Sequence, residues 1–151
     1  MITATQLYFA YGSNLSHDQM AWRCRDAVAV GAARLEGWQF RIGGRGYATV
    51  SPCPGLADAH VWGGLWSVSD ADLRSLDRYE GVSGGLYRRE PIQVRAEVGP
   101  RGGPELLECL IYIENHDDEG VPSPDYLAGI VTGASEFALP AAWIAELESW
   151  A

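Results

Sequence analysis

Near the N-terminus, an apolar and aromatic segment stops abruptly at a glycine, and a stretch compatible with a helix follows at once. Residues 8–15 read Tyr-Phe-Ala-Tyr-Gly-Ser-Asn-Leu, and residues 16–23 fit a short helix that Ser16 would cap. A strand, a tight turn and a helix start therefore fall within a few residues. Such a turn leaves backbone N–H groups unpaired at the positive end of a helix dipole. We therefore expect a seat for a carboxylate or phosphate at this turn.

The rest of the chain predicts more strands than helices. Ser69 is expected to cap a helix with Leu73 and Leu76 on its inner side, and Pro140 to occupy the first position of the last helix. Many strands with hairpin-like connections and few helices indicate an α+β fold with a closed or nearly closed sheet. The expected strands are 5–10, 27–35, 38–42, 48–51, 60–68, 86–98 and 105–113, and the expected helices are 16–23, 70–79, 124–133 and 140–150.

Length and composition limit the class of protein. A chain of 151 residues without a repeat or long linker predicts a single domain over residues 1–151. Its 47% apolar and 21% charged residues are typical of a soluble globular protein. The net charge of −9 argues against a nucleic-acid partner, which usually requires a basic face. An anionic small substrate stays compatible with that charge, because a local nest of N–H groups can outweigh a diffuse negative field.

Cysteine and histidine spacing predicts neither a disulfide framework nor a metal site. Cys24, Cys53 and Cys109 are widely spaced and form no C-x-x-C pair, and the three histidines are scattered. No stretch approaches the ~20 apolar residues that span a membrane. Residues 1–6 lack the basic segment of a secretory signal. We therefore expect a cytoplasmic protein with no membrane association.

A second segment of interest, residues 76–87, reads Leu-Asp-Arg-Tyr-Glu-Gly-Val-Ser-Gly-Gly-Leu-Tyr. It predicts a helix that ends at Glu80, with Gly81 just beyond its C-terminus. The helix dipole disfavours a carboxylate there, and partial burial would raise the pKa of Glu80 and make it a better base. Taken alone, the same pattern also fits a surface glutamate beside a capping glycine.

A third segment places two tyrosines on either side of an acidic loop. Tyr112 ends an expected strand and Tyr126 begins an expected helix, with residues 114–121 polar and acidic between them. Taken alone, each tyrosine favours a core or rim position over a substrate-binding one, because tyrosine commonly buries its ring and leaves its hydroxyl at an edge.

Four motifs, in one order over nearly the whole chain, resemble the γ-glutamylcyclotransferase family of the AIG2-like superfamily. They are Y-F-A-Y-G-S-N-L at 8–15, V-W-G at 61–63, L-D-x-x-E-G-V-x-x-G-x-Y at 76–87, and P-S-x-x-Y at 122–126 with G-A at 133–134 and L-P at 139–140.

The resemblance implies a small mixed α/β barrel with flanking helices, an enzyme that needs no cofactor or metal, and a small-molecule γ-glutamyl substrate. By match, Glu80 is the catalytic acid/base residue. The residues that the resemblance assigns to substrate binding are Tyr8, Phe9, Ala10, Tyr11, Gly12, Ser13, Asn14, Tyr87, Tyr112 and Tyr126.

The implied reaction is cyclisation of a γ-glutamyl amide to 5-oxoproline, with release of an amine or amino acid. Gly12 and Ser13 N–H groups would hold the α-carboxylate, so that the α-amine attacks its own γ-carbonyl. Glu80 would take a proton from the α-ammonium and return it to the departing nitrogen, so one carboxylate serves both roles. The loops 43–60 and 115–121 differ from those of animal members. Because these loops differ, the sequence is compatible with two classes of substrate: a free γ-glutamyl amino acid, or a γ-glutamyl-protected biosynthetic intermediate.

Two functions of other classes also fit the sequence. One is a binding module that keeps the anion-binding loop without catalysis. The other is a structural or interaction domain, since the chain has six tryptophans. Trp143 and Trp150 lie seven residues apart on the last expected helix, close to one face. An exposed patch there would indicate a homodimer.

Overall fold

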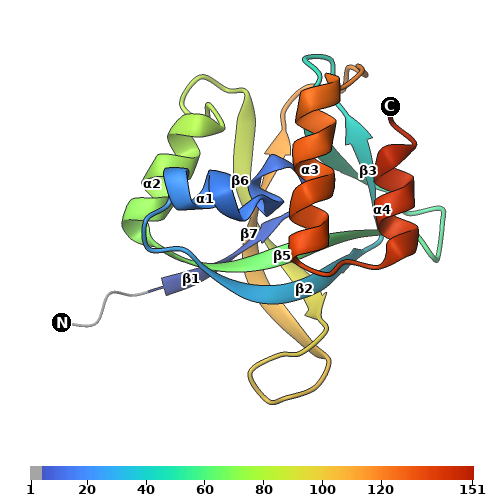
Figure 1. The fold of residues 1–151 in the computed structure, drawn as a ribbon. Helices are drawn as coiled ribbons and strands as arrows, with labels where there is room; N and C mark the ends of the chain where they lie inside the picture. Colours follow the sequence, from blue (N-terminus) through green and yellow to red (C-terminus); the bar gives the residue numbers. More distant parts are fainter. Residues whose placement is uncertain (1–4) are drawn as a thin grey trace.

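A closed five-stranded barrel is the centre of the fold (Figure 1), with the strand order β1-β5-β2-β6-β7. The computed structural model describes residues 5–151. Neighbouring strands are antiparallel except where β1 meets β7: these two run parallel, and their pairing at Tyr8 and Leu110 closes the barrel. The strands are β1 (Thr5–Ala10), β2 (Val28–Glu36), β5 (His60–Ser69), β6 (Tyr87–Ala96) and β7 (Glu105–Glu114).

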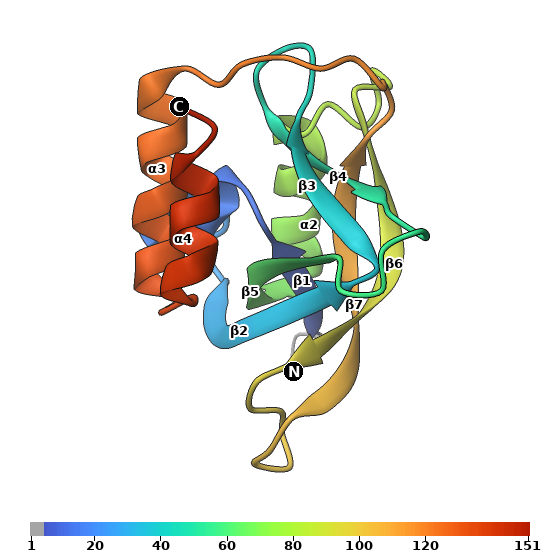
Figure 2. The same cartoon turned by 90° about the vertical axis from the view of Figure 1, so that its right-hand side faces the viewer.

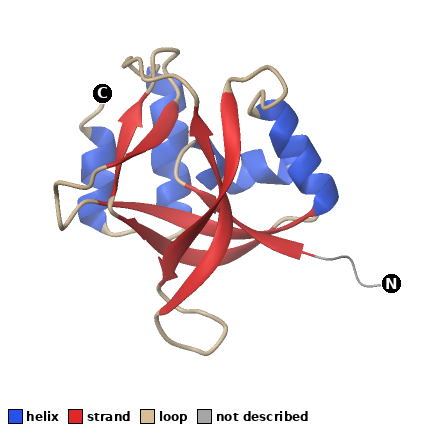
Figure 3. Cartoon of the chain, turned by 180° about the vertical axis from the view of Figure 1, so that it is seen from behind, coloured by secondary structure: helices blue, strands red, loops and turns tan. Residues whose placement is uncertain are grey.

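A separate hairpin and the helices complete the structure. The hairpin pairs β3 (Trp38–Ile42) with β4 (Ala48–Pro52). Helices α3 and α4 lie side by side (Figures 1 and 2), and the β6–β7 turn projects away from all the helices, also when seen from behind (Figure 3). The helical elements are the 3-10 turn η1 (Ser13–Leu15), α1 (His17–Arg23), α2 (Asp70–Tyr79), α3 (Pro124–Glu136) and α4 (Ala141–Glu148).

The expected elements are all present, with ends shifted by at most three residues. The Ser16 hydroxyl accepts a hydrogen bond from the Gln19 N–H, and Ser69 forms a capping box with Asp72, so both predicted caps are confirmed. The prediction for Pro140 is wrong by one residue. Its ψ of 142° is extended, so Pro140 is the N-cap and α4 begins at Ala141.

Two adjacent glycines in β5 let aromatic rings lie against both faces of the sheet. A Cβ on Gly63 would stand 2.6 Å from the Phe9 ring, and one on Gly64 would stand 2.6 Å from the Phe137 ring. Any side chain at these positions would push the rings away. The pair therefore allows Phe9 to pack at the core with 0% exposure.

The C-terminal segment covers the hairpin with two tryptophans, Trp143 on α4 and Trp150 just beyond the end of that helix. Trp143 is 4% exposed, and its ring lies 6.1 Å from that of Phe40, which also contacts Trp150 at 5.9 Å. These tryptophans dock α4 onto β3 and do not form the exposed patch that would have indicated a dimer. The strongly exposed tryptophan is Trp22, on α1.

Two expectations from the sequence concern the N-terminus and membrane-spanning segments. Residues 1–4, which belong to the expected domain and to the segment assessed for a secretory signal, lie outside the described residues. Within residues 5–151, no helix has both the length and the apolar character that crossing a membrane requires.

Helix α3 approaches the η1 turn so closely that one of its positions must be glycine. A Cβ on Gly133 would lie 2.4 Å from the Leu15 carbonyl carbon and 2.5 Å from the Ser16 nitrogen. These are backbone atoms, which cannot rotate away as a side chain can. This contact therefore sets the distance between α3 and the turn that follows β1.

Gly133→Ala and Gly129→Ala should change stability in opposite directions. Gly133→Ala forces α3 away from the η1 turn, and we expect it to lower the free energy of unfolding by about 1–3 kcal/mol. Gly129 lies one turn earlier on the same helix with open space around its Cβ position. Its replacement by alanine should stabilise the protein by up to about 1 kcal/mol through helix propensity. Urea unfolding of both variants tests this, and equal effects would contradict the close approach.

Candidate active site

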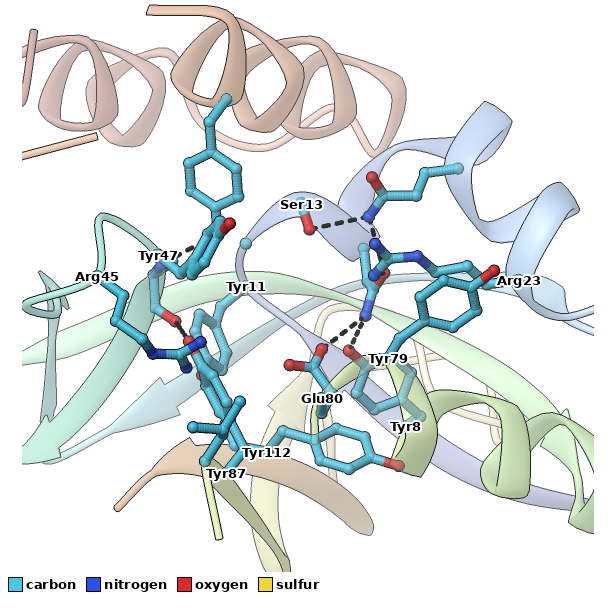
Figure 4. Close-up of a pocket in the computed structure, with 16 residues that line it drawn as sticks. Tyr8, Tyr11, Ser13, Arg23, Arg45, Tyr47, Tyr79, Glu80, Tyr87 and Tyr112 are labelled. Carbon is cyan, nitrogen blue, oxygen red and sulfur yellow. Dashed lines mark hydrogen bonds between the residues drawn. The ribbon is translucent and has the colours of Figure 1, made fainter. Parts of the chain in front are cut away.

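One cavity joins the three segments singled out from the sequence (Figure 4). Its volume is about 320 Å³, in the range of small-molecule sites, which is about 300–1,000 Å³. It lies where the end of β1, the end of α2 and the β3–β4 turn meet. The residues that line it are Tyr8, Tyr11, Gly12, Ser13, Asn14, Gln19, Arg23, Arg45, Tyr47, Ala48, Tyr79, Glu80, Leu86, Tyr87, Tyr112 and Tyr126.

Glu80 is the carboxylate of this cavity, held at the last turn of α2. It is the C-cap residue, and its N–H donates to the Leu76 carbonyl at 2.8 Å. Gly81 follows with φ +63°, a left-handed conformation that glycine adopts without strain, and turns the chain away from the helix. Burial raises the pKa of Glu80 from its usual 4.5 to about 7, although the charges of Arg23 and Arg45 and a hydrogen bond from Asn14 oppose the shift. Near neutral pH, this carboxyl group can therefore both accept and donate a proton.

Asn14 connects the turn after β1 to this carboxylate. Its side-chain Nδ2 donates to Glu80 Oε1 at 3.2 Å and to the Tyr8 hydroxyl at 2.9 Å. Its Oδ1 accepts from Gln19 Nε2 at 2.9 Å and from Arg23 Nη1 at 3.1 Å. Because both donors come from α1, they fix the oxygen on that side and leave the NH₂ group facing Glu80.

The turn itself presents free backbone donors. The Ser13 hydroxyl accepts from Gln19 Nε2 at 2.8 Å. The N–H groups of Gly12 and Ser13 donate to no acceptor among residues 5–151. Their carbonyls, in contrast, accept hydrogen bonds from the N–H groups of Leu15 and Ser16. A Cβ on Gly12 would lie 3.0 Å from the Cβ of Ala48, so the turn also touches the β4 wall. These free donors have the character of the anion seat expected from the sequence.

Three tyrosine hydroxyls around the cavity donate their hydrogen bonds to acceptors of the protein itself. Tyr11 donates to the Tyr112 carbonyl, Tyr87 to the Ala48 carbonyl at 2.7 Å, and Tyr112 to Asp77 Oδ1 at 2.7 Å. Burial raises the pKa of all three hydroxyls well above its ordinary value. They stay neutral at physiological pH and contribute rings to the walls. The Tyr112 hydroxyl in particular is bound at Asp77, which does not line the cavity.

Two other tyrosine hydroxyls act as acceptors and so keep a proton to donate. Tyr8 accepts from Asn14 Nδ2, and Tyr126 accepts from the Ala48 N–H at 2.9 Å. Burial raises the pKa of Tyr126 to about 12 and that of Tyr8 well above its ordinary value. Both are therefore neutral hydrogen-bond donors available to a bound molecule.

The cavity includes most, but not all, of the residues expected from the sequence. Phe9 and Ala10 do not line it: they are 0% and 1% exposed and belong to the core. Their suggested contact with substrate stays a prediction. The lining residues that were not expected are Gln19, Arg23, Arg45, Tyr47, Ala48, Tyr79 and Leu86.

The missed residues differ in how much signal they left. Gln19 and Arg23 lie four residues apart on the expected helix directly after the turn, so their shared face pointed to the site. Arg45 lies in the 43–60 loop, whose difference from animal members was noted in the sequence, but its own place at the cavity was not predicted. That place depends on where the β3–β4 hairpin packs against Tyr87 and Tyr126.

Comparison with known proteins identifies the family. Residues 60–147 match the AIG2-like family. The γ-glutamylcyclotransferase of Mus musculus is 34% identical over 146 residues, which cover 90% of this chain and 73% of that protein. The γ-glutamylcyclotransferase of Homo sapiens is 33% identical over 144 residues, which cover 89% and 72%. The chain belongs to the γ-glutamylcyclotransferase (AIG2-like) family.

The fold agrees with this membership. A solved structure described as a γ-glutamyl cyclotransferase superposes with a TM-score of 0.85 at 30% identity, over 97% of this chain and 88% of that chain. The mixed barrel that the four motifs implied is confirmed. The closed sheet and its four helices are the architecture of γ-glutamylcyclotransferases.

Burying Glu80 should cost stability in a pH-dependent way. Its folded pKa of about 7 lies above its usual 4.5, so between these values the folded state holds a proton that the unfolded chain has lost. Stability should therefore fall as pH rises through this window. We expect Glu80→Gln to be more stable than the parent by on the order of 2–3 kcal/mol at pH 8, and by less than about 1 kcal/mol at pH 5.

Urea unfolding at the two pH values measures this difference. Glu148→Gln, at an exposed position of α4, is the matched control and should not show it. If Glu80→Gln is no more stable than the parent at pH 8, burial of the Glu80 carboxylate does not lower the free energy of unfolding, and the prediction is wrong.

Proposed function

We propose that this protein is a γ-glutamylcyclotransferase that converts a γ-glutamyl amide to 5-oxoproline and a free amine, with Glu80 as general base and then general acid. The observation that carries the proposal is the Glu80 carboxyl group, whose pKa is raised to about 7 by burial, beside a turn with free N–H donors in one cavity. A carboxyl group of this kind suits proton transfer at neutral pH.

The reaction forms one C–N bond, breaks another, and moves two protons from the α-nitrogen to the leaving nitrogen. The substrate α-amine nitrogen attacks the γ-carbonyl carbon, and a five-membered lactam ring closes. The amide C–N bond then breaks. Glu80 takes one proton from the α-ammonium, which frees the amine to attack, and delivers it to the leaving nitrogen, so the carboxylate is regenerated. The attacking nitrogen loses its second proton as the lactam forms, and that proton completes the released amine as an ammonium ion. Since attacker and target belong to one molecule, the cavity has only to fold the substrate into an attacking conformation.

Positioning would come from the turn after β1. The Gly12 and Ser13 N–H groups support a seat for the substrate α-carboxylate, since they have no partner in the described part of the chain. The oxyanion of the tetrahedral intermediate needs its own donors. The hydroxyls of Tyr8 and Tyr126 support that role, because each accepts a hydrogen bond from the protein and retains a proton.

This reaction uses no metal or cofactor, and we place it in a reducing compartment such as the cytoplasm. Support comes from the cysteines, all of which are free thiols, with Cys24 and Cys109 buried.

Glu80→Gln should abolish most turnover while keeping the fold. The amide retains the size of the carboxyl group and can still accept from Asn14, but it cannot take a proton. We expect kcat to fall by about 10²–10⁴-fold. The measurement is 5-oxoproline release from γ-glutamyl derivatives of small amino acids, glutathione and bulky amines, with Glu148→Gln as control.

Unchanged turnover by folded Glu80→Gln would overturn the assignment of Glu80. If the unmodified protein forms no 5-oxoproline from any amide, the reaction itself is wrong, and a non-catalytic binding module becomes the better account.

The pH profile of kcat/KM should be bell-shaped and should respond to Arg23. Its rising limb reports Glu80 near pH 7, and its falling limb reports the substrate α-ammonium near pH ~8. The Arg23 charge lowers the pKa of Glu80, so Arg23→Gln should move the rising limb to higher pH. Arg101→Gln removes an equal charge from an exposed turn and should leave the limb in place. A limb that stays near pH 4.5 in the unmodified protein would contradict the role of a buried Glu80.

A further inference from the structure

Among residues 5–151, the charged side chains that line the cavity are Arg23, Arg45 and Glu80. Figure 4 shows the two arginines on opposite sides of Glu80. The cavity therefore has two positive charges separated by one negative charge, inside a protein whose net charge is −9. A local positive excess of this kind, against the overall charge, is typical of a site that binds an anion.

The two arginines are held in different ways. Arg23 Nη1 donates to Asn14 Oδ1 at 3.1 Å, and its guanidinium carbon lies 4.3 Å from the centre of the Tyr79 ring. It thus belongs to the polar network of the turn that holds Gly12 and Ser13. Arg45 instead comes from the β3–β4 turn, with its guanidinium 5.4 Å from the Tyr47 ring and 5.8 Å from the Tyr87 ring.

The donors of Arg45 are free. None of its N–H groups makes a hydrogen bond to any residue from 5 to 151. Its acidic partner is Glu114, with Arg45 Nε 3.8 Å from Oε1. A planar guanidinium with free donors binds a carboxylate in a two-pronged arrangement. The side chain is 38% exposed, so such a ligand can reach it from the cavity.

Glu114 lies behind Arg45 as a fixed counter-charge. Its side chain is 1% exposed, and its Oε2 has no hydrogen-bond partner in the described residues. It fits beneath the turn because Gly43 has no side chain: a Cβ there would overlap Glu114 Oε2. A buried carboxylate without hydrogen bonds is costly, so its pairing with Arg45 holds that arginine at the cavity wall.

We propose that Arg45 binds a carboxylate on the leaving group, with Glu114 as its positioning residue, so that this arginine discriminates between leaving groups with and without a carboxylate. This inference rests on the proposed cyclotransferase function and adds a specificity residue to it. A γ-glutamyl amide with a neutral amine or a blocked carboxylate as leaving group would then be a poor substrate.

The order of charges supports this orientation. A γ-glutamyl amino acid carries a carboxylate and an ammonium on its glutamyl end, then the amide, then a second carboxylate. The Arg23 side of the cavity, with the Gly12–Ser13 donors, matches the glutamyl end. Glu80 matches the ammonium and the amide, which leaves Arg45 for the second carboxylate.

The test compares γ-glutamyl-alanine with γ-glutamyl-alaninamide, which has nearly the same shape but no second carboxylate. For the unmodified protein, we expect kcat/KM to favour γ-glutamyl-alanine by about 10- to 100-fold, the range of one charge-assisted hydrogen-bonded contact. Arg45→Gln should reduce that ratio to within about threefold of one. Arg45→Lys keeps the charge without the planar fork and should give an intermediate ratio. Arg101→Gln is the control for loss of a positive charge and should keep the full ratio.

The ratio separates Arg45 from effects on Glu80. Removing the Arg45 charge also affects the pKa of Glu80, but that effect is common to both substrates and cancels in the ratio. Arg45→Gln leaves Glu114 as an unpaired buried charge, so Arg45→Gln/Glu114→Gln is the second variant in case the single one fails to fold. It should show the same loss of preference. Glu114→Gln alone should lower the ratio by less than Arg45→Gln, mainly through KM for γ-glutamyl-alanine.

Three results would overturn the inference: a ratio near one in the unmodified protein, a ratio that survives Arg45→Gln, or an equal fall for both substrates. Calorimetric binding of the two compounds to Glu80→Gln tests the same preference without turnover, with Glu80→Gln/Arg45→Gln as the comparison. A lack of 5-oxoproline in every assay would count against the cyclotransferase function, whereas 5-oxoproline formation with an unaffected ratio would count against Arg45 alone.

Discussion

The buried side-chain amide of Asn14 is the interaction on which the site depends. Its oxygen is held by two donors from α1, and its NH₂ group reaches Tyr8 and Glu80, while its backbone carbonyl accepts from Trp66 Nε1. One residue thus links the first strand, the first helix, the end of α2 and β5. Networks of this kind hold their members in a single arrangement only when every polar group has a partner. Glu80 can therefore be both buried and oriented.

In the site, burial raises the pKa of Glu80, and nearby positive charges partly oppose that rise. Burial alone would hold Glu80 protonated, which would weaken it as a base, and the Arg23 and Arg45 charges and the Asn14 hydrogen bond bring its pKa back toward neutrality. The two arginines also create a positive local field in a strongly acidic protein. In the proposed reaction, proton transfer by Glu80 and anion binding therefore depend on the same two side chains, and we expect a change to either arginine to alter both.

Sequence reasoning reached those parts of the structure that depend on neighbouring residues. The capped helices, the left-handed glycine after Glu80 and the strand–turn–helix unit are set by local backbone preferences. It did not reach contacts set by distant packing. Nothing near Tyr112 in the sequence indicates that its hydroxyl binds Asp77. Phe9 lies in a motif of the site, yet its side chain belongs to the core because alternate residues of a strand face opposite sides.

The Ala48 peptide group is held on both sides, by Tyr87 at its carbonyl and by Tyr126 at its N–H. Both bonds use backbone atoms, so they do not depend on which side chain stands at that position. The anchor of the hairpin is thereby separate from the turn at 43–47 that carries Arg45. Substitutions in that turn therefore leave the barrel and the hairpin anchor in place, while a change at Arg45 alters the pKa of Glu80. This wall of the cavity can thus change in chemistry while the hairpin keeps its position.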